Sequence, residues 1–145
     1  LRDEPLRLMY SAGSFSTEVK GTPFSVRSAT IHFDPASAAV LAQGAHCAEH
    51  IGHCVASPAD AFVHELLHAK MALLHTEDFI RSGALSSVTY PYAHERLVLK
   101  LERALYRDLT AHDERPRPLR RRHAGFLRSA ACVTCLEPET SLVSN

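Results

Sequence analysis

Residues 57–75 read SPADAFVHELLHAKMALLH, and this segment carries the clearest structural signals in the chain. Ser57 can cap a helix, Pro58 suits the first helical position and Asp60 falls in the first turn, a combination typical of a helix N-terminus. Apolar residues then occur on most sides of the helix, so it should be largely buried. The sequence therefore predicts a central helix from Pro58 to about His75.

Within this helix, residues 64–68 read HELLH, the HExxH pattern of zinc-dependent peptidases. Histidines four residues apart project from one helix face, so His64 and His68 can bind one metal ion while Glu65, about 100° round the helix, reaches the bound water. A zinc ion with three protein ligands lowers the pKa of that water toward about 7, and Glu65 would take its proton. The alternative is a buried helix whose histidines only form hydrogen bonds.

The third zinc ligand is expected at Glu95, because a catalytic zinc takes three protein groups and keeps one position open. Glu95 opens a second predicted helix, from about Ala93 to Leu109, and the loop before it is long enough to bring that helix across the first. The extended pattern HExxHxxGxxH does not apply, since Met71 and Leu74 stand where it requires glycine and histidine.

A second acid, Glu102, lies seven residues after Glu95 on the same helix face. We expect Glu102 to support a ligand from behind or to serve as the alternative ligand. The other interpretation is a solvated helix face on which the two acids pair with Arg96 and Arg103.

The stretch from Ile31 to Arg107 resembles the bacterial secreted-effector zinc endopeptidases of the NleD type, which share their plan with clostridial neurotoxin light chains. The matching elements are a strand ending in IHFD at residues 31–34, the Pro-led helix carrying HELLHA at 64–69, and a following helix with an acid pair. The family commonly has Glu-Glu followed by Arg, where this chain has His94-Glu95-Arg96.

This resemblance implies a compact α+β, zincin-like domain: a small sheet, a buried helix with HExxH and a second helix with the third ligand. It also implies a Zn²⁺-dependent endopeptidase that is secreted, delivered into host cells and active on a host signalling protein. For stabilising the transition state we prefer Tyr106 and Arg107, which follow the ligand helix, among the candidates of suitable type: Tyr90, Tyr92, Tyr106, Arg107, His112 and His123.

Length and charge set the domain organisation. The 145 residues suffice for one domain, and the net charge of zero argues against nucleic-acid binding by the main body. Residues 1–114 carry ten basic and fourteen acidic residues, whereas residues 115–145 carry six and two. We therefore predict a metallopeptidase domain over 1–114 and a basic segment over 115–145 that packs on it or trails from it.

No apolar run approaches the roughly 20 residues of a membrane span, and no signal peptide is visible. Because the first residue is Leu1 rather than methionine, we expect a fragment whose targeting segment has been removed, and we expect a monomer. The basic run over 115–123 is interpreted first as a solvated linker and second as a docking segment for an acidic partner or membrane surface.

Four cysteines form two pairs in the sequence, at 47 and 54 and at 132 and 135. The first pair lies in HCAEHIGHC, residues 46–54, which suits a second metal site, a Cys47–Cys54 disulfide or an ordinary loop. Cys132 and Cys135 form a lone CxxC, and an alternative is that they join Cys47 and Cys54 in a four-thiolate zinc site.

Other strands and loops are predicted less directly. A strand over 6–10, a Ser/Gly-rich turn over 11–16 and a strand from about Phe24 to Phe33 precede residues 36–45, which suit a helical turn or an edge strand. Regular structure is expected to end at 113–118, where two prolines occur.

Two further functions compete with the peptidase. The first is a non-catalytic metal-binding interaction protein on the same scaffold, which recognises partners through its basic segment. A DNA-associated zinc protease is disfavoured, because the chain is neutral and lacks a downstream Gly-His ligand.

Overall fold

The structure is a computed structural model that describes residues 5–41, 49–83, 93–120 and 125–137. In this part of the chain the fold is α+β, with two small sheets and three α-helices. The strands are β1 (Leu6–Tyr10), β2 (Ser16–Thr22), β3 (Ser25–Phe33), β4 (Ser37–Leu41), β5 (Val55–Ala56) and β6 (Gly125–Ser129). The helices are α1 (Pro58–Leu74), α2 (Thr76–Arg81) and α3 (Ala93–Asp113), with a short 3-10 turn at Ile51–His53.

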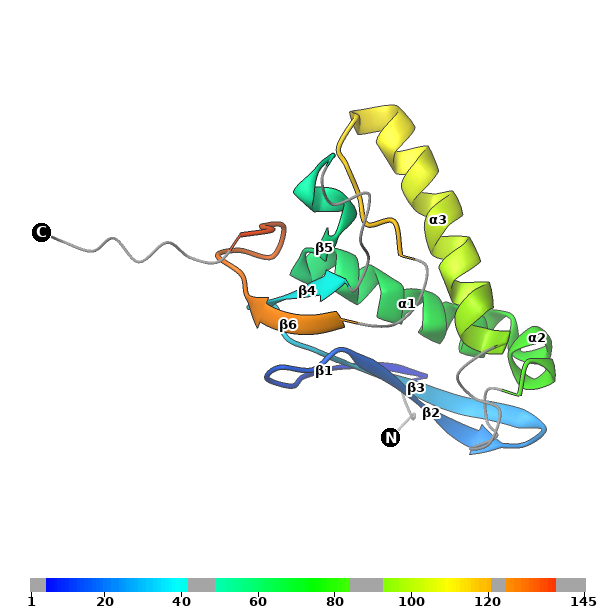
Figure 1. Ribbon diagram of the computed structural model, residues 1–145. Helices are drawn as coiled ribbons and strands as arrows, with labels where there is room; N and C mark the ends of the chain where they lie inside the picture. The colour runs from blue at the N-terminus through cyan, green and yellow to red at the C-terminus, as the bar shows by residue number, and fades with distance from the viewer. Residues whose placement is uncertain (1–4, 42–48, 84–92, 121–124, 138–145) are drawn as a thin grey trace, which may run out of the picture.

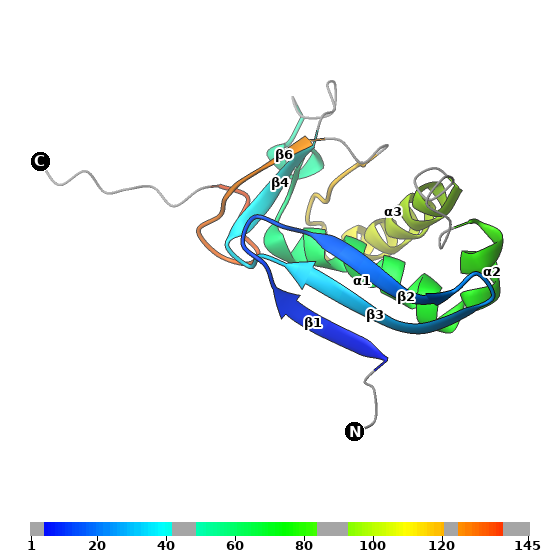
Figure 2. The ribbon, with the colours of Figure 1, turned by 90° about the horizontal axis from the view of Figure 1, so that it is seen from below.

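The larger sheet has the order β1-β3-β2, with β3 parallel to β1 and antiparallel to β2. Its inner face lies against α1, where Ala29 and Ile31 of β3 pack on Ala69 (Figure 2). The smaller sheet has the order β5-β4-β6, with β4 antiparallel to both neighbours. At the start of β6 the chain comes so close to β4 that a Cβ atom at Gly125 would lie 2.0 Å from the Val40 carbonyl oxygen.

Helix α1 lies between the larger sheet and α3 (Figure 1). Its first turn forms a capping box, in which Ser57 Oγ accepts from the Asp60 backbone N–H and Asp60 accepts from that of Ser57. Towards its C-terminal end, Leu67 and Met71 pack with Phe79 of α2 and Val98 of α3. Burial on both sides therefore holds α1 at the centre, as the sequence predicts.

Helix α3 presents a polar side to this core. The buried positions His94, Val98, Glu102 and Tyr106 recur every four residues and so form one stripe that faces inward. Two of the four are ionisable side chains buried almost completely, His94 and Glu102. Such groups are rarely buried unless they are paired, so this stripe indicates a polar cluster between α1 and α3.

Most elements agree with the sequence analysis. The strands over 6–10 and about 24–33 and the helix from Pro58 are confirmed, and residues 37–41 form a strand rather than a helical turn. The second helix runs four residues beyond its predicted end at Leu109, to Asp113. Residues 84–92, in the loop before this second helix, lie outside the described residues.

Two predictions about the C-terminal part are wrong. Regular structure does not end at 113–118, because β6 pairs with β4. The basic run is not a solvated linker in its described part, since Arg117 is 9% and Arg120 5% exposed. Arg117 pairs with Asp113, and the Leu119 backbone N–H donates to the His53 carbonyl, so the run is held against the domain.

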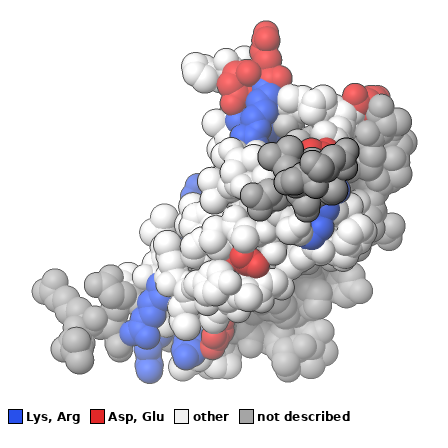
Figure 3. Space-filling view, turned by 90° about the vertical axis from the view of Figure 1, so that its left-hand side faces the viewer, with Lys and Arg blue, Asp and Glu red and all other residues white. Residues whose placement is uncertain are grey.

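Across the described residues, no helix has both the length and the apolar character of a membrane span. Figure 3 shows the side of the molecule at the left of Figure 1. Its charged side chains are sparse, and basic and acidic groups are interspersed.

Candidate metal centre

His64, His68 and Glu95 converge between α1 and α3. The Nε2 atoms of the two histidines lie 3.1 Å apart, and each also lies 3.1 Å from one oxygen of the Glu95 carboxylate. Tetrahedral ligands with bonds of about 2.0–2.1 Å to zinc lie roughly 3.3–3.4 Å from one another, close to this spacing. The three side chains are therefore arranged as two nitrogens and a carboxylate around a common point.

The other ring nitrogens of the two histidines have buried partners. His64 Nδ1 lies 2.8 Å from Glu102 Oε2, and His68 Nδ1 lies 2.7 Å from His94 Nε2. A carboxylate can only accept here, so His64 carries a proton on Nδ1. If His68 donates its Nδ1 proton to His94 in the same way, both Nε2 lone pairs face Glu95.

The residues therefore fit a divalent metal ion. Two Nε2 lone pairs and a carboxylate that face one another repel, unless a cation or a proton lies among them. A divalent cation satisfies all three groups at once, and partners on the far ring nitrogens are typical of metal-binding histidines. Two imidazoles and one carboxylate form a donor set that zinc accepts.

Without a metal, the protonation of the cluster follows from burial and these contacts. Burial lowers the pKa of His64, but contacts with Glu102 and Glu95 outweigh burial and hold that pKa above its ordinary value. Burial and the neighbouring His68 lower the pKa of His94 to about 4, so His94 is neutral at pH 7. Burial raises the pKa of Glu95, yet the contacts with the two histidines prevail and hold it far below its usual range.

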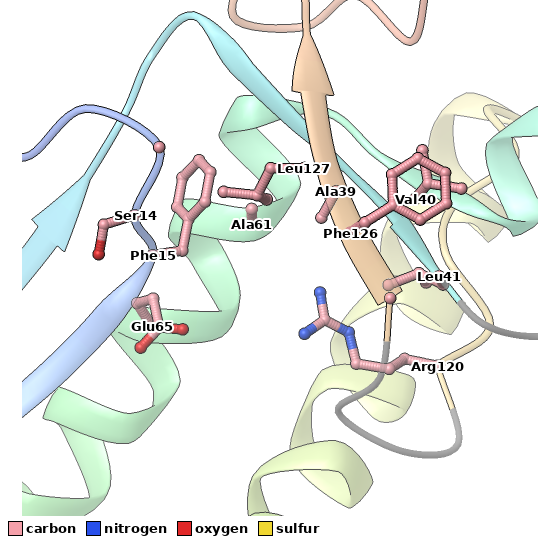
Figure 4. Close-up of a pocket in the computed structure, with 12 residues that line it drawn as sticks. Ser14, Phe15, Ala39, Val40, Leu41, Ala61, Glu65, Arg120, Phe126 and Leu127 are labelled. Carbon is pink, nitrogen blue, oxygen red and sulfur yellow. The ribbon is translucent and has the colours of Figure 1, made fainter.

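Glu65 lies on an adjacent face of α1 and is 3% exposed. The Thr17 hydroxyl lies 2.8 Å from Glu65 Oε2 and 2.9 Å from the Glu65 carbonyl oxygen, so β2 fixes this side chain. Glu65 also lines a pocket of about 290 Å³ between the Gly13–Phe15 turn and the β4–β6 sheet (Figure 4). Glu65 therefore forms part of the wall of this pocket, whereas His64, His68 and Glu95 are not among its lining residues.

Tyr106 and Arg107 do not line this pocket. The Tyr106 hydroxyl donates to the Asp60 carbonyl, and burial raises the pKa of Tyr106. Arg107 is exposed on α3, as is His112. The other candidates of that group, Tyr90, Tyr92 and His123, lie outside the described residues.

Both acids of α3 face the histidines, which contradicts the interpretation of a solvated acidic face. Glu102 is 1% exposed and contacts His64, and the Glu95 side chain is 18% exposed. Glu102 lies on the Nδ1 side of His64, behind the ligands, and Glu95 lies on the Nε2 side.

The cysteines do not form a four-thiolate site. Cys132 and Cys135 are bonded to each other, and Cys54 is also disulfide-bonded. Cys47 and His46 lie outside the described residues. His50 caps the 3-10 turn by accepting from the Gly52 backbone N–H, a structural role.

Three residues of the site were not found from the sequence as partners of the cluster. They are His94 behind His68, Thr17 beside Glu65, and Arg120, whose Nε lies 3.7 Å from Glu102 Oε1. His94 precedes Glu102 by eight residues, or two intervals of four, which places both on one helix face, and this spacing was a usable signal for His94. Thr17 and Arg120 come from distant segments whose composition gives no such signal.

Comparisons with protein-family models, with curated proteins and with solved structures found no match to this chain.

The donor set predicts zinc binding, and replacing Glu102 with alanine is expected to weaken that binding by about 10- to 100-fold, because His64 loses the partner that orients its ring. Competition with a chromophoric chelator measures this affinity. The control is Asp108→Ala, which removes an exposed acid from the same helix. Unchanged affinity in Glu102→Ala would show that this contact does not support a metal ligand.

The metal-free protein is expected to be most stable near pH 6.5. Because the pKa of His64 is raised in the folded state, protonated His64 stabilises the fold, and this stabilisation is complete at pH values below the ordinary pKa of 6.5. The stabilisation is lost as the pH rises through the raised pKa. The lowered pKa of His94 acts oppositely, since its contribution is lost as the pH falls from 6.5 toward about 4. Thermal unfolding of chelated protein between about pH 5 and 8.5 measures the profile. A midpoint that climbs steadily across the alkaline half contradicts this assignment.

Proposed function

We propose that this protein is a zinc-dependent endopeptidase that hydrolyses peptide bonds of a protein substrate. The observation that carries the proposal is the convergence of His64, His68 and Glu95, with Glu65 adjacent and facing a pocket. A metal site with only a structural role closes its coordination with four protein ligands, whereas a catalytic site supplies three and leaves one position open. Among the described residues the cluster has three such ligands with a neighbouring carboxylate, which favours catalysis.

In this proposal each residue of the site has a distinct role. Zinc, when bound, supplies Lewis acidity and an acidified water. His64 and His68 would hold the ion through Nε2 and Glu95 through its carboxylate, while Glu102 and His94 keep the two imidazoles in the tautomers that bind. Thr17 orients Glu65, which accepts a proton from the attacking water and passes it to the leaving amine.

The finer fold and the biological setting belong to the same proposal. A helix carrying HExxH over a small sheet, followed by a helix with the third ligand, is the zincin-like plan of the secreted-effector endopeptidases that this chain resembles. We extend from that resemblance the expectation of secretion, of delivery into host cells and of a host signalling protein as the substrate.

The proposal is tested by incubating the zinc-loaded chain with a library of peptides and identifying the products by mass spectrometry. Internal cleavage is expected, and it should stop when zinc is chelated and return when zinc is restored. Stoichiometric zinc without cleavage of any peptide would instead favour the non-catalytic metal-binding interaction protein.

A further inference from the structure

A buried, positively charged side chain, that of Arg120, lines the pocket beside Glu65. Arg120 lies seven residues after the end of α3, is 5% exposed, and lines the pocket together with Glu65. Figure 4 shows its guanidinium directed into the cavity, on the side opposite Glu65. We call this space the Arg120 pocket; its apolar lining includes Phe15, Val40, Leu41, Phe126 and Leu127.

The charge of Arg120 is only partly compensated by the described residues. Its Nε lies 3.7 Å from Glu102 Oε1, too far for a hydrogen bond, and no described acceptor bonds to that nitrogen. Glu102 also serves His64 through its other oxygen. Arg120 forms no ion pair with Glu65, although both line the pocket. Within the described part of the chain, the buried Nε of Arg120 therefore has no hydrogen bond to offset its desolvation.

A carboxylate is the group that best completes this arrangement. The planar guanidinium presents a fork of donors that matches a carboxylate with two parallel hydrogen bonds. The apolar walls strengthen such a pair by excluding water. A volume of about 290 Å³ lies at the lower end of small-molecule sites and suits one amino-acid residue.

We propose that the Arg120 pocket binds a substrate residue that carries a carboxylate, with the Arg120 fork holding the acid and the apolar walls holding its carbon chain. This inference rests on the proposed function, because the bound residue belongs to a substrate only if the protein is a peptidase. In that case the bound residue lies beside Glu65 and next to the cleaved bond. The carboxylate comes either from an acidic side chain within a peptide, which agrees with internal cleavage, or from the C-terminus of a chain, in which case the cleavage would release C-terminal residues instead.

The test measures binding of small probes to the metal-free full chain by isothermal titration calorimetry, so that no probe is held by zinc. N-acetylleucine carries a terminal carboxylate and N-acetylglutamate α-amide a side-chain carboxylate. Their neutral counterparts are N-acetylleucinamide and N-acetylglutamine α-amide. At least one acid is expected to bind about tenfold or more tightly than its counterpart, and which acid does so identifies the source.

Arg120→Met is expected to abolish this preference, and Arg120→Lys to reduce it, because lysine keeps the charge but loses the fork. Arg103→Met, at an exposed position on α3, should keep it. If Arg120→Met does not fold, the inference is tested by comparing the preference for acidic probes in the wild-type chain with that in Arg120→Lys. Equal binding of acids and neutral counterparts, no binding of either acid, or a preference that survives in Arg120→Met overturns the inference.

Failure of this inference is distinguishable from failure of the proposed function. Acid-selective binding to the metal-free chain, with no peptide cleaved by the zinc-loaded chain, would leave the pocket as a carboxylate site and remove the peptidase. Peptide cleavage by the zinc-loaded chain, together with equal binding of the acidic and neutral probes, would support the peptidase and reject the carboxylate site.

Discussion

Replacing Glu65 with glutamine is expected to slow peptide hydrolysis by about 10²- to 10⁴-fold while zinc remains bound at one ion per chain. Glutamine keeps the shape of the side chain and can still accept from the Thr17 hydroxyl, but it cannot take a proton from water. Steady-state cleavage of a fluorogenic peptide chosen from the library measures the rate, and mass spectrometry of the intact protein under native conditions measures the zinc.

Glu77→Gln is the matched control, because Glu77 is exposed on α2 and the same chemical change there should leave the rate unaltered. Two results would contradict a role for Glu65 as the base. One is a zinc-loaded Glu65→Gln variant as active as the wild type. The other is cleavage that falls equally in both variants, which would show that the loss is not specific to Glu65.

Replacing Glu95 with glutamine is expected to weaken zinc binding by more than about 100-fold, beyond the loss expected for a residue behind the ligands. The carboxylate contacts Nε2 of both histidines at 3.1 Å, so it supplies the negative charge that a divalent ion meets in this site. An amide of the same size supplies only a neutral oxygen. Equilibrium competition with a zinc chelator gives the affinity, and hydrolysis should fall with it.

Asp108→Asn serves as the control for Glu95→Gln, since it neutralises an exposed acid on the same helix. Both variants should retain the helical signal of the wild type in circular dichroism. A Glu95→Gln protein that binds zinc as tightly as the wild type would show that the third ligand lies elsewhere in the chain.

The features predicted well from the sequence are those encoded locally. Ser57, Pro58 and Asp60 mark the start of α1 within four residues, and the spacing of His64 and His68 needs only the geometry of a helix. Glu95 required one further step, that the second helix returns across the first. The separation of 27 residues from His68 to Glu95 supported that step, because it leaves room for a loop that brings the second helix back.

What escaped prediction depends on contacts between distant segments. Strand β2 is short and its exposed residues are polar, so its role appears only when Thr17 meets Glu65. Arg120 sits in a run of arginines and prolines whose composition is typical of a solvated linker. Arg120 is buried next to Glu102, which itself contacts His64, so this position could not be inferred before α1 and α3 were placed together.

The account is tested most directly by diffraction from crystals of the zinc-loaded protein, with data collected on both sides of the zinc absorption edge. One anomalous peak per chain is predicted, about 2.0–2.1 Å from Nε2 of His64 and of His68 and about 2.0–2.2 Å from a Glu95 carboxylate oxygen. A peak at other side chains, or none at this cluster in zinc-saturated crystals, would contradict the central claim that these three residues form a metal site.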